Sequence, residues 1–299
     1  MSSPQIEHLS KCRLGEAVVW SAAEQAVYWT DIFGKVIFRK KYQGGTQSWI
    51  LEKGLTSLGF TKTGELVGTF VDGLYKLDLA HGAHQLISSP ALNYDDVRFN
   101  DGAVDTHGYY WAGTMHMLDP VNNPIGQLFR FHPQQKFTVQ DYGFHVPNGP
   151  CFSKDGKWMF HTDTLVRQTI FKCELTPSGE MLSRGRFVQI EQQGTYPDGM
   201  TLDVEGNLWV ALWGGWGVNQ YSPAGKLIKH IRLPVSQVTK CVFGGADMST
   251  LFITSASEYL QPEDLIAQPL AGALFSLKTD TQGYAENAFS IKYLATPTD

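Results

Sequence analysis

The sequence predicts an all-β protein, specifically a six-bladed β-propeller. The first observation is a polar position that recurs six times at intervals of 40, 44, 48, 50 and 41 residues, each time four residues before an apolar one. Its occupants are Glu16, Thr56, Asn100, Asn148, Asp198 and Thr239. A period of this size is typical of repeat architectures, in which neighbouring supersecondary units complete a shared core.

The second observation is the order of segments inside each repeat. After the polar position comes a short apolar stretch and then a turn, which in four repeats ends in glycine, at Gly64, Gly108, Gly156 and Gly206. Glycine supplies the positive φ that tight hairpins need. The sixth turn is less regular.

The third observation is the kind of segment that follows each turn. These segments are short and rich in aromatic or β-branched residues, which favours strands. They are Val27-Tyr-Trp-Thr, Glu65-Leu-Val-Gly, Tyr109-Tyr-Trp-Ala, Lys157-Trp-Met-Phe, Asn207-Leu-Trp-Val and Leu251-Phe-Ile-Thr. Few stretches have a helical period of adequate length. Several strands per unit and six units favour a propeller over a sandwich, whose strands show no long period.

The length of the chain agrees with this interpretation. Six blades share 299 residues, which leaves roughly fifty for each, as propeller blades require. No linker, charge block or low-complexity segment interrupts the repeats, and a ring cannot be cut into two independently folding halves. We therefore expect one domain over residues 1–299.

Composition restricts the partners. The N-terminus is too polar for a signal peptide and the chain has no apolar run long enough for a membrane helix, so a cytoplasmic location without membrane contact is expected. Four cysteines show no C-x-x-C spacing, which makes free buried thiols the expectation. A net charge of −5 does not favour the basic surface that binding to nucleic acid requires. A small molecule is the favoured partner.

The recurring position also predicts a site. Equivalent positions in a closed ring converge on its axis, so two carboxylates, two amides and two hydroxyls would meet there. Carboxylate and amide oxygens are hard ligands suited to a divalent cation. Taken singly, Asn148-Gly and Asp198-Gly are ordinary turn signatures, and Glu16 is explained equally well as a solvated turn residue. The hydroxyls of Thr56 and Thr239 are expected to line the tunnel and bond water or backbone.

Several motifs resemble one family. They are Leu14-Gly-Glu-Ala-Val-Val-Trp20, Arg98-Phe-Asn-Asp-Gly102, Trp111-Ala-Gly-Thr-Met115, Asn148-Gly-Pro-Cys-Phe-Ser153, Pro197-Asp-Gly-Met200, Leu208-Trp-Val-Ala211, Phe243-Gly-Gly and Gln268-Pro-Leu-Ala-Gly272. In this order they resemble the gluconolactonase, regucalcin (senescence marker protein) and luciferin-regenerating-enzyme family, nearly end to end. The resemblance implies a six-bladed propeller with one divalent cation in its central tunnel and, for most enzyme members, hydrolysis of sugar lactones.

Carried over residue by residue, the resemblance implies that Glu16, Asn148 and Asp198 hold the metal and that Arg98 and Asn100 bind the substrate. The arginine fork and the amide suit a polyhydroxylated ring with a carbonyl. Asn100 also fits a metal contact, direct or through water, or else an Asn-Asp-Gly turn. Two carboxylates and an amide suit Ca²⁺, Mg²⁺, Mn²⁺ or Fe²⁺, with catalytic Zn²⁺ as an alternative.

One departure from the family concerns the substrate. A glutamate that contacts substrate in regucalcin is replaced here by Leu118. His116 or Asp119 of the same loop are the alternatives for a polar contact. Trp213 and Trp216, in a Gly-rich loop, either stack on a sugar face at the tunnel mouth or pack between blades.

The resulting hypothesis is metal-dependent hydrolysis of a sugar lactone to the sugar acid. Metal-activated water attacks the carbonyl, and Asp198 acts as general base or only as a metal ligand. A phosphotriester or aryl-ester hydrolase on the same scaffold and a non-catalytic, metal-binding regulatory propeller are the alternatives. No Gly-x-Ser-x-Gly elbow and no dinucleotide fingerprint supports other chemistry.

Overall fold

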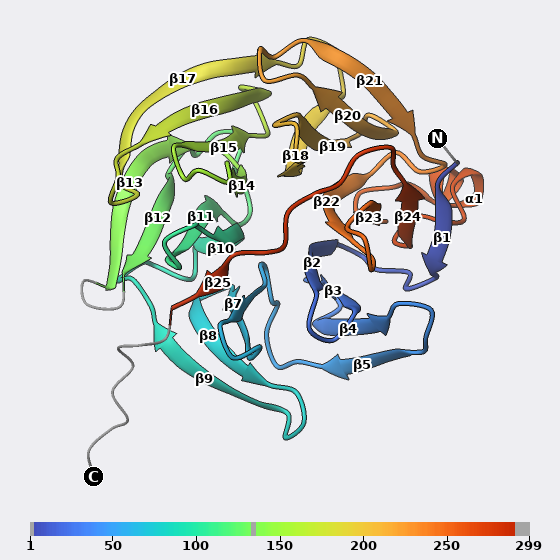
Figure 1. The fold of residues 1–299 in the computed structure, drawn as a ribbon, viewed down its shortest axis with the longest axis horizontal. Helices are drawn as coiled ribbons and strands as arrows, with labels where there is room; N and C mark the ends of the chain where they lie inside the picture. The colour runs from blue at the N-terminus through green and yellow to red at the C-terminus, as the bar shows by residue number, and fades with distance from the viewer. Residues whose placement is uncertain (1–2, 133–135, 291–299) are drawn as a thin grey trace.

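The computed structural model describes residues 3–132 and 136–290, and its strands form six sheets arranged in a ring, as Figure 1 shows. Within each sheet, consecutive strands of the chain pair antiparallel and form a blade that runs from the ring axis outward through hairpins. The predicted six-bladed, all-β fold is therefore confirmed.

The strands alternate in chain order with the turns expected from the repeats. The first blade contains β2 (Gly15–Ser21), β3 (Ala26–Asp31), β4 (Val36–Lys41) and β5 (Thr46–Ile50), and the second contains β6 (Gly59–Thr61), β7 (Leu66–Phe70), β8 (Gly73–Asp78) and β9 (Ala83–Ser88). The third contains β10 (Val97–Val104), β11 (Tyr110–His116), β12 (Gly126–His132) and β13 (Lys136–Phe144), and the fourth contains β14 (Pro147–Phe152), β15 (Trp158–Asp163), β16 (Thr169–Leu175) and β17 (Met181–Gln189). The fifth contains β18 (Tyr196–Leu202), β19 (Leu208–Trp213), β20 (Gly217–Tyr221) and β21 (Leu227–Arg232), and the sixth contains β22 (Val238–Gly244), β23 (Thr250–Ser255) and β24 (Leu274–Lys278).

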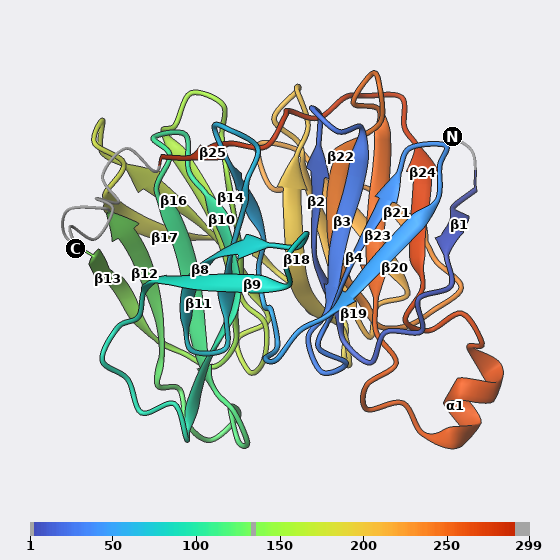
Figure 2. The ribbon, with the colours of Figure 1, turned by 90° about the horizontal axis from the view of Figure 1, so that it is seen from below.

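The two end strands of the described chain close the ring. β1 (Gln5–His8) adds to β24 as the outermost strand of the sixth blade, so that blade combines both ends of the sequence. β25 (Ala288–Phe289) pairs in parallel with β6, at the inner edge of the second blade. The segment between β24 and β25 therefore crosses one end of the central tunnel, where Figures 1 and 2 show it in red.

Turn aspartates connect the hairpins to the core in two blades. In the third blade, Oδ1 of Asp105 accepts hydrogen bonds from the turn amides of His107 and Tyr109, while Oδ2 accepts the indole N–H of Trp111 at 2.8 Å. Asp203 and Trp209 repeat this arrangement in the fifth blade, at 2.9 Å. Each aspartate thus satisfies the single indole donor of a fully buried tryptophan, which explains why an aspartate in the turn precedes the tryptophan by six positions.

A single short helix was not expected. α1 (Pro262–Ala267) lies between β23 and β24, and its Pro262 occupies the first turn, where a missing N–H costs nothing. Asp264 accepts a hydrogen bond from the backbone of Gln261 at 3.2 Å and so caps the helix start. Figure 2 shows that α1 and the crossing C-terminal segment lie at opposite ends of the tunnel.

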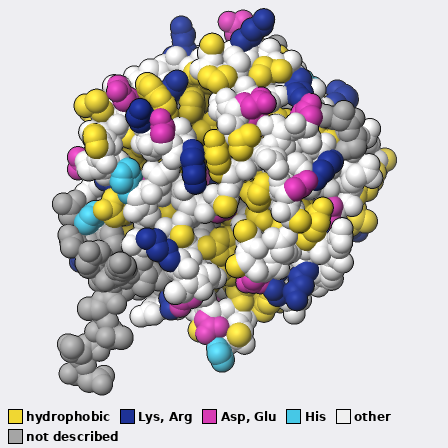
Figure 3. Space-filling view, in the orientation of Figure 1, with side chains coloured by type: hydrophobic (Ala, Val, Ile, Leu, Met, Phe, Trp, Pro, Cys, Tyr) yellow, Lys and Arg dark blue, Asp and Glu magenta, His cyan; other side chains and the backbone are white. Residues whose placement is uncertain are grey.

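The face of the molecule in Figure 3 shows no block of like charges. On the face in Figure 3, lysines and arginines alternate with aspartates and glutamates around the ring. Across residues 3–132 and 136–290, no helix is long and apolar enough to span a bilayer. All four cysteines are free, as their spacing predicted.

Candidate functional site

All five predicted site residues line one cavity at the α1 end of the tunnel. The cavity has a volume of about 200 Å³. Glu16, Arg98, Asn100, Asn148 and Asp198 contribute to its lining, and none is more than 9% exposed. Residues separated by up to 182 positions in sequence (16 to 198) therefore meet at one place.

Backbone irregularities place these side chains on the tunnel axis. The innermost strand of five blades shifts register at or just after the recurring polar position. In β2 the shift lies between Glu16 and Val19, and in β14 between Asn148 and Cys151. A β-bulge bends the strand and redirects a side chain, so the repeat seen in the sequence is a repeat of bulges.

Hydrogen bonds fix the orientation of the two amides. Nη1 of Arg98 donates to Oδ1 of Asn100 at 3.0 Å, and Nδ2 of Asn100 donates to Oδ1 of Asn148 at 2.8 Å. Nδ2 of Asn148 donates to the hydroxyl of Thr164 at 2.8 Å, which in turn donates to the carbonyl of Pro197 at 2.7 Å. The network spans three blades and leaves the second lone pair of the Asn148 amide oxygen available.

The two carboxylates disfavour each other's charge. Burial and the nearby charge of Asp101 raise the pKa of Glu16 to about 8. Burial, followed by the charges of Glu16 and Asp101, raises the pKa of Asp198 well above its ordinary value. Two buried carboxylates in one cavity need a positive charge between them to remain ionised at neutral pH.

The donor set fits a divalent cation. Within the described residues, Oδ1 of Asp198 is buried and accepts no hydrogen bond, so an acceptor atom in the cavity lacks a partner. The described residues contain no group of three or more His, Cys, Asp or Glu side chains arranged for an ion. A cation here would therefore depend on an amide oxygen, that of Asn148, to complete a three-ligand protein set with Glu16 and Asp198, and such a set suits a hard cation.

An ion pair that the sequence did not reveal lies directly beneath the site. Nζ of Lys240 meets Oδ1 of Asp101 at 2.5 Å across the tunnel, and both residues are buried. Burial disfavours the charged amine, but Asp101 and Glu16 together raise the pKa of Lys240. A Cβ on Gly199 would come within 2.5 Å of the Lys240 chain, so this glycine makes room for the lysine to reach Asp101.

The sequence contains a regularity that marks the Asp101–Lys240 pair. Asp101 and Lys240 each come one residue after a recurring polar position, Asn100 and Thr239. An Asn-Asp-Gly turn predicts that Asp101 caps its own backbone. It does accept the Gly102 amide at 2.7 Å, but it also accepts the Gly149 amide at 3.0 Å and pairs with Lys240.

Replacing Lys240 with methionine is expected to destabilise the protein by about 3 kcal/mol, because the Asp101 carboxylate would stay buried without its cation. Urea unfolding of the purified protein measures the change. The double variant Lys240→Met/Asp101→Asn should regain most of the loss, since no unpaired charge remains. A single variant as stable as the double variant would contradict this role for the pair.

The remaining sequence predictions have mixed outcomes. Leu118 is 85% exposed and does not line the cavity. Nδ1 of His116 accepts the backbone amides of Leu118 and Asp119, and Asp119 binds Asn122, so both alternatives serve the loop itself and neither lines the cavity. Trp213 lines the cavity, whereas Trp216 does not and instead lies under Arg232.

The two threonines of the repeat bond to backbone carbonyls. Thr56 donates to the carbonyl of Thr69 at 3.0 Å, and Thr239 donates to that of Gly15 at 2.5 Å. Neither lines the cavity. Only four of the six recurring positions therefore contribute side chains to it.

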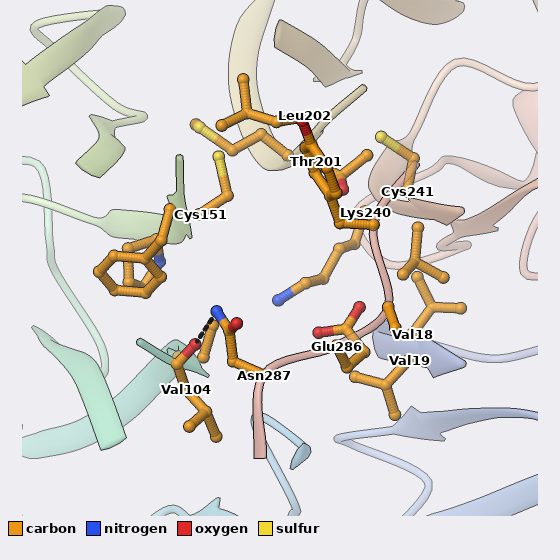
Figure 4. A pocket seen from close by; sticks show the side chains of 18 of the residues that line it. Val18, Val19, Val104, Cys151, Thr201, Leu202, Lys240, Cys241, Glu286 and Asn287 are labelled. Atoms are coloured by element: carbon orange, nitrogen blue, oxygen red, sulfur yellow. Dashed lines mark hydrogen bonds between the residues drawn. The ribbon is translucent and has the colours of Figure 1, made fainter. Parts of the chain in front are cut away.

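A second, smaller chamber of about 80 Å³ occupies the other end of the tunnel. Tyr284 to Asn287 of the crossing C-terminal segment line it together with Lys240, and Figure 4 shows the side chains of Lys240 and Glu286 near one another there. Asn287 donates to the carbonyl of Val104 at 3.0 Å, which holds the segment against the third blade. The chamber and the cavity share no lining residue.

Comparison with known proteins identifies the family. Residues 14–257 match the family described as SMP-30/Gluconolactonase/LRE-like region. This chain belongs to that family. The SMP-30/gluconolactonase/LRE-like match covers the recurring polar positions from Glu16 to Thr239 and thus every residue of the candidate site.

Relatives within the family cover nearly the whole chain. The 6-deoxy-6-sulfogluconolactonase of Pseudomonas putida is 34% identical over 281 residues, which are 93% of this chain and 95% of the relative. Regucalcin of Oryctolagus cuniculus is 32% identical over 288 residues, with the same shares. Among solved structures, a calcium-binding regucalcin from Agrobacterium tumefaciens superposes with a TM-score of 0.90 at 25% identity, over 97% of this chain and 98% of that one.

Proposed function

We propose that this protein hydrolyses a sugar lactone to the corresponding sugar acid and that it does so with a divalent cation held by Glu16, Asn148 and Asp198. The observation that carries the proposal is the composition of the cavity. It combines two mutually repelling carboxylates, one of them with an unpartnered oxygen, with the donors of Arg98 and Asn100. The family membership and the lactonase named among the relatives support the same reaction class.

The cation would supply positive charge beside the lactone carbonyl, which favours attack on its carbon. Ca²⁺, Mg²⁺, Mn²⁺, Fe²⁺ and Zn²⁺ are all candidates for this position, and the calcium-binding relative makes Ca²⁺ the first to test.

Arg98 and Asn100 would hold the substrate. One Arg98 nitrogen is engaged by the carbonyl of Phe99 at 2.9 Å and by Asn100, so the side chain is fixed while its remaining N–H groups stay available. Because neither residue can shift without breaking these bonds, the lactone oxygens would meet donors that are already oriented, which lowers the entropic cost of binding.

Asp198 would accept the proton of the attacking water and then donate it to the leaving oxygen. As water adds to the carbonyl carbon, its proton would pass to the Asp198 oxygen that does not hold the cation. When the ring carbon–oxygen bond breaks, that proton passes to the leaving oxygen, which becomes a hydroxyl of the acid. A bound cation lowers the pKa of the carboxyl that holds it, so Asp198 would keep the proton only until the ring oxygen leaves.

The test is acid release from a panel of lactones by protein stripped with chelator and then supplied with each divalent metal. The panel contains pentono- and hexonolactones of both ring sizes, the 6-deoxy-6-sulfo form of gluconolactone suggested by the Pseudomonas putida relative, an aryl ester and a phosphotriester. Metal-dependent acid release from a sugar lactone supports the proposal. If metal binding is confirmed and no lactone in the panel releases acid, the proposed function is contradicted.

A further inference from the structure

The cavity is divided into a polar floor and an apolar wall. The charged side chains that line it, Glu16, Arg98 and Asp198, all come from innermost strands. Above them, five side chains form what we call the apolar wall: Phe33, Pro120, Leu165, Trp213 and Tyr259. The five side chains contain two polar atoms, the indole nitrogen of Trp213 and the hydroxyl of Tyr259, whereas Phe33, Pro120 and Leu165 contain none.

The apolar wall has a regular origin in the fold. Phe33, Pro120 and Leu165 lie in the connections from the second to the third strand of their blades, Trp213 ends the second strand of the fifth, and Tyr259 follows β23 in the sixth. All these connections open on the α1 end of the tunnel. The second blade connects β7 to β8 by only two residues, which are too few to reach the cavity. Five blades of six therefore each add one apolar side chain to the mouth.

No cation lines the wall that could receive an acidic group. Arg98 of the floor lies close enough to Tyr259 for the two groups to interact electrostatically, and the guanidinium of Arg13 lies 5.4 Å from the ring centre of Phe33. Arg13 is paired with Glu258 at 3.1 Å, so its charge is already compensated. Of the residues that line the cavity, Arg98 is the single cation, and it belongs to the floor.

We propose that the apolar wall selects a lactone with an apolar group on the side away from its carbonyl, such as the methyl group of a 6-deoxyhexonolactone. This inference rests on the proposed lactone hydrolysis, because the carbonyl must face the floor. A hydroxyl placed against Phe33, Pro120 or Leu165 loses water and meets no polar side-chain atom of these three residues, whereas a methyl group gains apolar contact. The wall therefore determines specificity, while the floor determines the reaction.

Two matched pairs of lactones test the inference, since each pair differs by one hydroxyl. They are L-fucono-1,4-lactone with L-galactono-1,4-lactone, and L-rhamnono-1,4-lactone with L-mannono-1,4-lactone. We expect kcat/KM to be about ten- to a hundredfold higher for the 6-deoxy member of each pair. Leu165→Asn, which keeps the size of the side chain but adds polar atoms, should bring the ratio to within about threefold.

The neighbouring residue provides a matched control. Val166 is 57% exposed, does not line the cavity and has a φ of 56°, a conformation that asparagine tolerates well. Val166→Asn should therefore leave the ratio unchanged. Phe33→Asn is the second wall variant, in case Leu165→Asn folds poorly, and a thermal melt of each variant checks its fold.

The possible outcomes test the specificity of the apolar wall and the proposed lactone hydrolysis separately. Hydrolysis with equal or reversed preference in both pairs overturns the apolar-wall inference and leaves the lactonase function standing. A preference that Leu165→Asn and Phe33→Asn both leave intact also overturns it. Absence of acid release from every lactone overturns the proposed function and this inference together.

Discussion

Asp198→Asn is expected to reduce turnover of the best lactone by about a thousandfold. The substitution removes the proton acceptor and also one of the two negative charges proposed to hold the cation, and general base catalysis alone contributes about 10²–10⁴. The asparagine has nearly the same size and the position is buried, so packing should change little. Steady-state acid release at saturating metal measures the effect.

An exposed aspartate serves as the control for this variant. Asp95 lies on the surface and outside the cavity, so Asp95→Asn should retain the turnover of the unmodified protein. Metal titration of Asp198→Asn by calorimetry separates loss of the cation from loss of the base. Turnover by Asp198→Asn equal to that of the Asp95→Asn control would refute the assignment of the site.

Removing the metal is expected to lower both activity and thermal stability. A ligand present at 100 times its Kd stabilises the folded state by about 2.7 kcal/mol, which corresponds to a shift in Tm of roughly 5–10 °C for a domain somewhat smaller than this one. Calorimetric melts with and without chelator measure the shift. The reason is the repulsion between Glu16 and Asp198, which a bound cation would relieve.

The double variant Glu16→Gln/Asp198→Asn isolates that cause. Without either charge there is no repulsion to relieve, so its Tm should not respond to chelator or metal. Its metal-free form should be at least as stable as the metal-free unmodified protein. A melt of the unmodified protein that chelation leaves unchanged, or a double variant that still responds to metal, would show that the cation is held elsewhere.

The repeat made much of the fold and the floor of the site predictable. A polar residue that returns every 40 to 50 positions marks the point where each blade meets the axis, and four of those residues do line one cavity. Periodicity is informative here because every blade has an equivalent inner strand and five of the six have nearly the same bulge.

Other parts of the site depend on contacts that no spacing records. Thr164 orients Asn148 from a different strand, and Lys240 reaches Asp101 only because Gly199 leaves room for it. The apolar wall comes from connections of unequal length, so its members do not recur at a fixed interval. Leu118 stands where the family resemblance implies a glutamate in contact with substrate, but here the side chain is exposed to solvent.

The layer between the two tunnel compartments determines how molecules can move. The cavity is lined by Glu16, Asn100, Asn148 and Asp198, and the smaller chamber by residues that lie two positions further along the same four strands, while the Asp101–Lys240 pair lies between them. Beyond that chamber, the C-terminal segment covers the far end. The Asp101–Lys240 pair and the C-terminal segment therefore both obstruct the tunnel on the side of the cavity away from α1. For the proposed reaction, we expect the acid to leave through the same mouth by which the next lactone arrives. Because both molecules would bind the same cavity, inhibition by the acid product should be competitive with the lactone.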